Sequence, residues 1–162
     1  MFWTTMILRK WTPLVAKATI VGIVGMTLVL TGCEKFALDR QMKELCMKDG
    51  GIKLYETVNL PADHFSDNGL PKFYQLQGVE PTDRLGKDYQ FRSETTELKP
   101  GSASLWRSRY VVLRRVDNKT LGELVVYGRR GGDLPGPWHE SYQLCPENTR
   151  DVDLVRKIFL VK

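Results

Sequence analysis

Apolar residues between positions 34 and 49 recur with the spacing of one helical face. The stripe consists of Leu38, Met42, Leu45 and Cys46. These positions follow an i, i+4, i+7, i+8 pattern, which places them on one side of an α-helix. Gly50 and Gly51 come next and favour a helix stop. The pattern predicts a helix over residues 34–49 that packs its apolar side against its own fold rather than against a partner.

Four further segments have the composition of strands or edge segments. They are Ile52–Val58, Lys72–Gln77, Asp88–Leu98 and Trp138–Cys145. In the third, Tyr89 and Phe91 have the same parity, so we expect both on the inner face. Turn-forming residues separate the segments, and they are dense between Leu60 and Pro71, where we expect a loop.

The clearest element is a β-hairpin, because two β-prone runs, Leu105–Val116 and Leu121–Arg130, flank a polar turn. Centring the turn on Asn118 and Lys119 brings favourable side chains opposite one another. The predicted pairs are Leu113 with Leu124, Val111 with Val126, Val112 with Val125, Tyr110 with Tyr127, and Arg114 with Glu123. Both faces carry apolar groups, which predicts a central place in the sheet.

The end of the chain, Val152–Val161, is compatible with a helix or a strand. Its apolar residues Leu154, Val155, Ile158 and Phe159 favour the helix. Together these elements predict an α+β fold with an amino-terminal helix, an antiparallel sheet around a central hairpin, and a possible carboxy-terminal helix.

The first 33 residues have the order of an export signal. Arg9, Lys10 and Lys17 precede the apolar run Ala18–Leu30, and Leu30-Thr31-Gly32-Cys33 follows. This stretch resembles the lipobox of bacterial lipoprotein precursors. The resemblance implies that residues 1–32 are a signal peptide, that Cys33 receives a diacylglycerol, and that its freed amino group is acylated, for example by palmitate. Residues 33–162 would then form a single periplasmic domain.

The length of the apolar run favours cleavage over a permanent membrane span. Its thirteen residues cover roughly 20 Å as a helix, against the ~30 Å of a hydrocarbon core. An uncleaved amino-terminal anchor remains the alternative. Because two or more acyl chains hold a protein stably on a bilayer, a modified Cys33 needs no protein partner to stay there. Glu34, in place of the Asp that favours inner-membrane retention in enteric bacteria, implies the outer membrane.

Removal of the signal peptide also changes the charge balance. The chain has 24 Lys+Arg and 19 Asp+Glu, a formal net charge of +5. The leader holds three of these bases and no acids, which leaves 21 against 19, or +2. The remaining charges are interspersed rather than gathered on one basic stretch. The sequence therefore gives no indication of nucleic-acid binding.

The number of cysteines, three, also fits an exported protein. An odd number is unusual in an oxidising compartment, but lipidation of Cys33 leaves Cys46 and Cys145 as an even pair. The periplasm favours oxidation, so we predict a structural disulfide between them. A redox or metal site is the weaker interpretation because the chain has no CxxC motif.

The sequence contains no recognisable catalytic constellation, and we predict no catalytic residue, metal or cofactor. His139, Glu140 and Ser141 have suitable residue types, but neighbours in a strand point to alternating faces. His64 lies near Asp63 and Asp67 in an expected loop, where polar residues are ordinary. A small periplasmic hydrolase using His139 and Glu140, or His64, is therefore the alternative hypothesis.

The candidate interaction surface consists of Arg107, Arg109, Arg129, Arg130 and Trp138. In the predicted hairpin register the arginines approach one another, and Trp138 ends the Gly- and Pro-rich stretch that follows them. Arg and Trp are favoured anchors of interfaces. A solvated rim of arginines and a core-capping Trp138 are the ordinary alternative. The leading hypothesis is a lipid-anchored, non-enzymatic envelope protein that binds another envelope protein or the cell wall.

Overall fold

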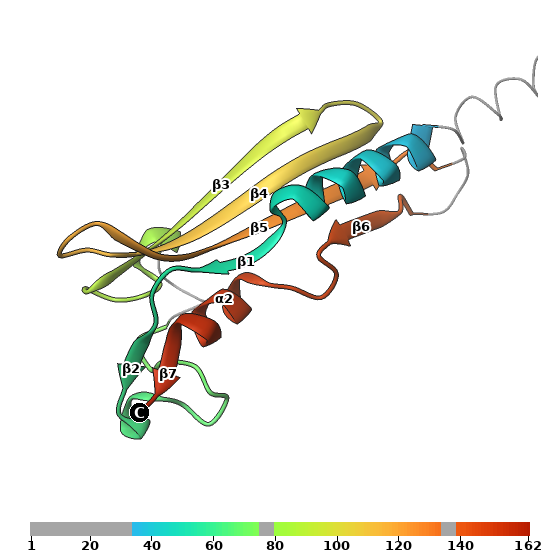
Figure 1. Cartoon of the computed structure of the whole chain (residues 1–162). Helices are drawn as coiled ribbons and strands as arrows, with labels where there is room; N and C mark the ends of the chain where they lie inside the picture. Colours follow the sequence, from blue (N-terminus) through green and yellow to red (C-terminus); the bar gives the residue numbers. More distant parts are fainter. Residues whose placement is uncertain (1–33, 75–79, 134–138) are drawn as a thin grey trace, which may run out of the picture.

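The computed structural model of the chain describes residues 34–74, 80–133 and 139–162 (Figure 1). The predicted signal peptide and Cys33 lie outside these residues.

Residues 34–49 are helical. The other elements are β1 (Gly51–Leu54), β2 (Val58–Leu60), the 3-10 helices η1 (Ala62–His64) and η2 (Pro81–Asp83), β3 (Tyr89–Lys99), β4 (Ala103–Arg114), β5 (Lys119–Gly131), β6 (Tyr142–Cys145), α2 (Asp151–Ile158) and β7 (Phe159–Val161). The fold is α+β, as predicted.

The hairpin of β4 and β5 forms the centre of an antiparallel sheet ordered β1-β5-β4-β3. The other edge of β5 pairs with β1 over Gly122–Val125 and with β6 over Tyr127–Arg130. These two short strands therefore follow one another along β5, and β3 forms the opposite edge of the sheet (Figure 1). β2 and β7 make a separate parallel pair.

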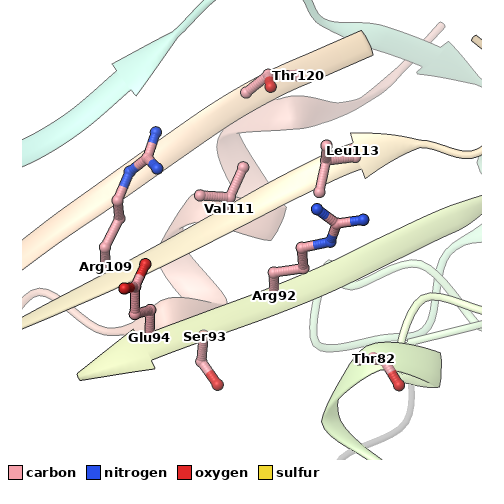
Figure 2. Close-up of a pocket in the computed structure, with 8 residues that line it drawn as sticks. All are labelled: Thr82, Arg92, Ser93, Glu94, Arg109, Val111, Leu113 and Thr120. Carbon is pink, nitrogen blue, oxygen red and sulfur yellow. The ribbon is translucent and has the colours of Figure 1, made fainter. Parts of the chain in front are cut away.

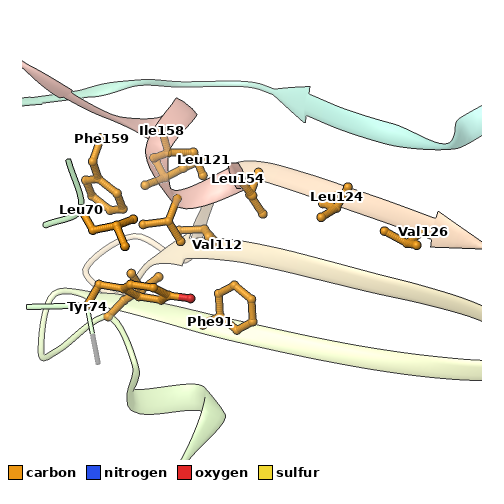
Figure 3. Close-up of a cluster of buried hydrophobic side chains, with 12 residues drawn as sticks. Leu70, Tyr74, Phe91, Val112, Leu121, Leu124, Val126, Leu154, Ile158 and Phe159 are labelled. Atoms are coloured by element: carbon orange, nitrogen blue, oxygen red, sulfur yellow. The ribbon is translucent and has the colours of Figure 1, made fainter. Parts of the chain in front are cut away.

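The two faces of the sheet are covered by different helices. α2 packs on one face, over a cluster of buried residues that includes Leu70, Phe91, Val112, Leu124, Leu154 and Ile158 (Figure 3). The helix of residues 34–49 packs on the other face, where the buried cluster is Leu38, Met42, Cys46, Ala103, Leu105, Val125 and Tyr127. We call these the α2 face and the amino-helix face. β5 supplies both clusters, and its residues 121–129 are all buried.

The helix of the described residues 34–49 carries the predicted apolar stripe and ends where predicted. Leu38, Met42 and Cys46 are buried, and the helix ends before Gly50. Cys46 forms the predicted disulfide with Cys145 of β6, closing a separation of 99 residues. The bond joins the last turn of the helix to the sheet beneath it.

The predicted register of the hairpin is wrong by three residues. Leu124 lies opposite Tyr110 rather than Leu113, and Val112 lies opposite Gly122. The register shifts between Val112 and Leu113, where Leu121 is an extra residue on β5. Because apolar residues alternate onto both faces of these strands, side-chain pattern alone does not select one register.

The new register redistributes the side chains. Tyr110, Val112, Leu124 and Val126 share the α2 face, and Val111, Val125 and Tyr127 share the amino-helix face. Arg114 does not pair with Glu123. It forms ion pairs with Glu56 at 2.8 Å and with Asp117 at 3.2 Å.

Three other predicted segments differ in extent. Ile52–Val58 is divided between β1 and β2, because the amides of Tyr55 and Glu56 both bond to the carbonyl of Leu121 and the chain bends. Of Lys72–Gln77, residues 72–74 contain no strand and the rest lie outside the described residues. The strand expected at 138–145 is confined to β6.

The carboxy-terminal segment combines both conformations left open by its sequence. α2 begins with Asp151 and Asp153 in its first turn, where carboxylates interact favourably with the helix dipole. The Asp153 side chain also accepts a hydrogen bond from the backbone N–H of Arg150 at 2.8 Å. Leu154, Val155 and Ile158 are buried, and the chain then continues as β7.

Loss of the disulfide should strongly destabilise the domain. Replacing both Cys46 and Cys145 with Ser opens a loop of 99 residues, for which chain entropy gives a loss of up to ~4.7 kcal/mol. The free energy of unfolding, measured in guanidinium chloride, checks this value. The unsubstituted protein under reducing conditions should show the same loss, and equal stability of the two forms would contradict the expected role of the bond.

Candidate interaction surfaces

Arg107 belongs to a hydrogen-bonded cluster at the end of the amino-terminal helix. Its Nη2 lies 2.9 Å from Asp49 Oδ2, and its Nε donates to Tyr127 Oη at 3.2 Å. Tyr127 Oη in turn donates to Asp49 Oδ1 at 2.6 Å. The bond from Tyr127, aided by Arg107, outweighs burial and lowers the pKa of Asp49 from its ordinary 3.8. The cluster fastens the helix end to β4 and β5.

Arg109 belongs to a second cluster of the same composition, built on Glu123. Arg109 Nη2 donates to Glu123 Oε2 at 2.6 Å, and Tyr55 Oη donates to Glu123 Oε1 at 2.7 Å. Burial alone would raise the pKa of Glu123, but the bonds from Tyr55 and Arg109 outweigh it and lower this pKa from 4.5. The carboxylate therefore remains ionised and joins β4 and β5 to Tyr55, the residue that follows β1.

Arg129 is almost fully enclosed, with 2% of its surface exposed. Its Nε donates to Asp39 Oδ1 at 2.7 Å, and its Nη1 donates to the carbonyl of Gly131 and to Ser141 Oγ. A buried charge is stable only when it is paired and hydrogen-bonded, so these contacts explain why the Arg129 guanidinium can be buried. Arg129 connects the helix of residues 34–49 to β5 and to the segment before β6.

A further ion pair holds the first described turn of the helix. Lys35 Nζ lies 2.6 Å from Asp133 Oδ1, and the backbone N–H of Ser141 donates to the other carboxylate oxygen. The bond from Lys35, followed by those from Ser141, holds the pKa of Asp133 well below its usual range. Asp133 therefore links Lys35 of the helix to Ser141, which precedes β6.

The structure separates the arginines of the predicted surface. Arg107, Arg109 and Arg129 lie on the amino-helix face, each paired with a carboxylate, whereas Arg130 alternates onto the α2 face and is exposed. Trp138, the fifth residue of that prediction, lies outside the described residues.

A hollow of about 620 Å³ opens on the amino-helix face, over β3 and β4 (Figure 2). It is lined by Thr82, Arg92, Ser93, Glu94, Arg109, Val111, Leu113 and Thr120. Arg92 and Glu94 stand on edge strand β3 beside Val111 of β4 (Figure 2). The hollow offers both charge signs, hydroxyl groups and a small apolar floor, a combination suited to polar contacts. Neither histidine lines it.

A second surface, on the α2 face, combines aromatic rings with a cation. The rings of Trp106 and Tyr142 have centroids 5.5 Å apart and planes inclined by 32°. Arg130 is paired across the strands with Tyr142, which is 56% exposed. Neither ring belongs to a buried cluster. We call Trp106, Arg130 and Tyr142 the aromatic surface.

Gly128 allows the indole to occupy its place on the sheet. A Cβ atom at this position would lie 2.2 Å from Trp106 Cζ2, a distance that no real contact adopts. The missing side chain is therefore a requirement of the aromatic surface. Trp106 and Gly128 face each other across β4 and β5, so a correct hairpin register would have identified the pair from the sequence.

The residues of the alternative hydrolase hypothesis are not assembled into an acid–base site. His139 and Glu140 are exposed in the segment before β6, and Ser141 is engaged with Asp133 and Arg129. His64 ends η1, an exposed turn that precedes the bridge between Phe65 and Pro71. Within residues 34–74, 80–133 and 139–162, no group of three His, Cys, Asp or Glu side chains is placed to hold a metal ion.

Comparisons with known proteins give no relationship for this chain. No family model, curated protein or solved structure matches it. None of the helices in the described segments has the length and apolar character needed to cross a bilayer. Function must therefore be inferred from the residues and their geometry.

Glu123 should make the stability of the domain depend on acidity. Since its pKa is lower in the folded chain than the ordinary 4.5, its ionised form stabilises the fold above pH 4.5. This contribution is lost as the pH falls through the lower folded value. Glu123→Gln should cost about 1 to 2 kcal/mol at pH 7 and much less at pH 3.

Urea unfolding at the two pH values measures this difference. Glu94→Gln is the matched control, because no ion pair to Glu94 is formed by the described residues although it lies on the same face. An equal effect of Glu123→Gln at pH 7 and pH 3 would contradict the assigned role.

Proposed function

We propose that this chain is a lipid-anchored protein of the bacterial envelope, held on the periplasmic side of the outer membrane, that binds another envelope protein without catalysing a reaction. The lipobox-like sequence ending at Cys33 supports the anchor. The aromatic surface is the observation that supports binding.

The composition of the aromatic surface is that of an interface anchor. Tryptophan, tyrosine and arginine contribute large, rigid contact areas and carry a disproportionate share of binding energy. Tyr142 is exposed and Trp106 is held in place by its fit over Gly128, so little conformational freedom is lost when a partner covers them. In contrast, the cations Arg107, Arg109 and Arg129 are already engaged within the fold.

The anchor can be tested directly by the mass of the protein extracted from membranes. We expect a chain that begins at Cys33 and carries the added mass of a diacylglycerol and an amide-linked acyl group. A chain in which unmodified Cys33 is still joined to Gly32 would overturn the anchor and favour the uncleaved signal.

The binding surface can be tested by site-specific photocrosslinking in intact cells. A photoreactive amino acid in place of Tyr142 should give a discrete protein adduct that is lost when Arg130 is also replaced by Glu. Leu160 of β7, which is exposed at 41%, is the matched control position and should give no such adduct.

The kind of adduct distinguishes the partners. A crosslinked band of fixed size that protease removes supports an envelope protein as the partner. A ladder of crosslinked bands that disappears after muramidase digestion would instead identify the cell wall as the partner. The same adducts from Tyr142 and Leu160 would overturn the assignment of this surface.

A further inference from the structure

The amino-terminal helix has a second stripe, on the side away from the sheet. It consists of Phe36, Arg40, Lys43 and Met47. At about 100° per residue, these four positions fall within about 60° of arc. The buried stripe of Leu38, Met42 and Cys46 is centred about 130° away around the helix axis. The outward stripe therefore alternates two large apolar side chains with two cations.

The apolar members of this stripe are unusually exposed for their size. Phe36 is 74% exposed and Met47 is 79% exposed, whereas Leu38, Met42 and Cys46 of the same helix are buried. Within the part of the chain that the structure describes, neither Arg40 nor Lys43 forms an ion pair. Glu44 and Lys48 flank the stripe, so Arg40, Lys43, Glu44 and Lys48 give this side of the helix a net charge of +2.

The stripe begins immediately after the proposed lipid attachment site. Residues 34–37 are already helical, so no unwound spacer separates Phe36 from the residue after Cys33. Even a fully extended chain reaches no more than about 11 Å over three residues. A lipid held in the bilayer at Cys33 therefore keeps Phe36 at the membrane surface.

We propose that this helix lies along the membrane surface, with Phe36 and Met47 inserted among the lipids and Arg40 and Lys43 bound to anionic phospholipid headgroups. The proposal rests on the lipid anchor of the proposed function. The two apolar residues are about 16 Å apart along the helix axis, so both reach the bilayer only if the axis runs in its plane. An exposed apolar face flanked by Lys and Arg is typical of interfacial helices.

The anchor makes a weak surface interaction sufficient. Two apolar side chains and two or three cations would hold a free helix only briefly, because each cation contributes modestly near an anionic surface. A chain already fixed at Cys33 presents the stripe at a high local concentration. The helix therefore sets the orientation of the domain, and the lipid sets its location.

This orientation determines what the rest of the domain presents. The helix runs along β4 and β5 on the amino-helix face (Figure 1), so it lies between the sheet and the bilayer. The α2 face, with the aromatic surface, points away from the membrane toward the periplasm. The membrane contact and the partner contact use opposite faces of the same sheet.

Depth-dependent quenching tests the proposal on the mature lipidated protein. Phe36→Trp and Met47→Trp are compared with Val116→Trp, an apolar position in the β4–β5 turn that is 86% exposed. The proteins are reconstituted in phosphatidylethanolamine vesicles with 25% phosphatidylglycerol, in which a fraction of the acyl chains carries bromine. We expect the added fluorescence at positions 36 and 47 to be quenched at least twofold more than that at 116.

Charge reversal provides the second measurement. Arg40→Glu with Lys43→Glu should reduce quenching of Trp at position 47 at least twofold, and so should replacing phosphatidylglycerol with phosphatidylcholine. Lys157→Glu with Lys162→Glu, at two exposed positions near the carboxy-terminal end, is the matched control and should leave quenching unchanged.

The outcomes separate the helix from the anchor. If the protein sediments with vesicles but Trp at 36 and 47 is quenched no more than Trp at 116, the membrane-lying helix is wrong and the anchor stands. If the protein fails to sediment with vesicles, the anchor of the proposed function is wrong, and this orientation falls with it.

Discussion

The structure depends on the burial of β5 on both of its faces and the pairing of both of its edges. Residues 121–129 are buried without interruption. Helices pack on both faces of the sheet, while β4 pairs with one edge of β5, and β1 and β6 pair with the other. A shift of this strand by one residue would move every side chain to the opposite face, and Glu123 and Arg129 would leave their ion-pair partners for the apolar α2 face. The surfaces described above are positioned by their place relative to this strand. The Glu123 carboxylate and the Gly128 gap are both part of it.

The two clusters divide the domain by role. The α2 face is built from aliphatic and aromatic packing, with Phe91, Leu124 and Ile158 at its centre. The amino-helix face combines a smaller apolar cluster with ion pairs and the disulfide. Charged groups are costly to bury alone but are stable when paired, and three arginines meet their carboxylates on this side. The helix is therefore fixed by several independent contacts.

Much of this arrangement follows from the sequence. Helical spacing located residues 34–49, cysteine number and export signal pointed to the disulfide, and apolar residues on both parities placed the hairpin centrally. The hairpin register did not follow, because the extra Leu121 leaves no trace in a pattern that is apolar on both faces. Charge also misled: a sequence displays an arginine but not its partner, so buried Arg129 resembled a surface residue.

The position of the Cys46–Cys145 bond has a mechanical consequence. With the proposed lipid anchor at Cys33, any force that pulls the domain away from the membrane enters the helix at residue 34. The force passes along the helix to its last turn, where a covalent bond transfers it to β6 and, through hydrogen bonds, to β5. Peeling of the helix from the sheet can therefore proceed no further than Cys46, and the chain that bears tension is no longer than residues 34–46.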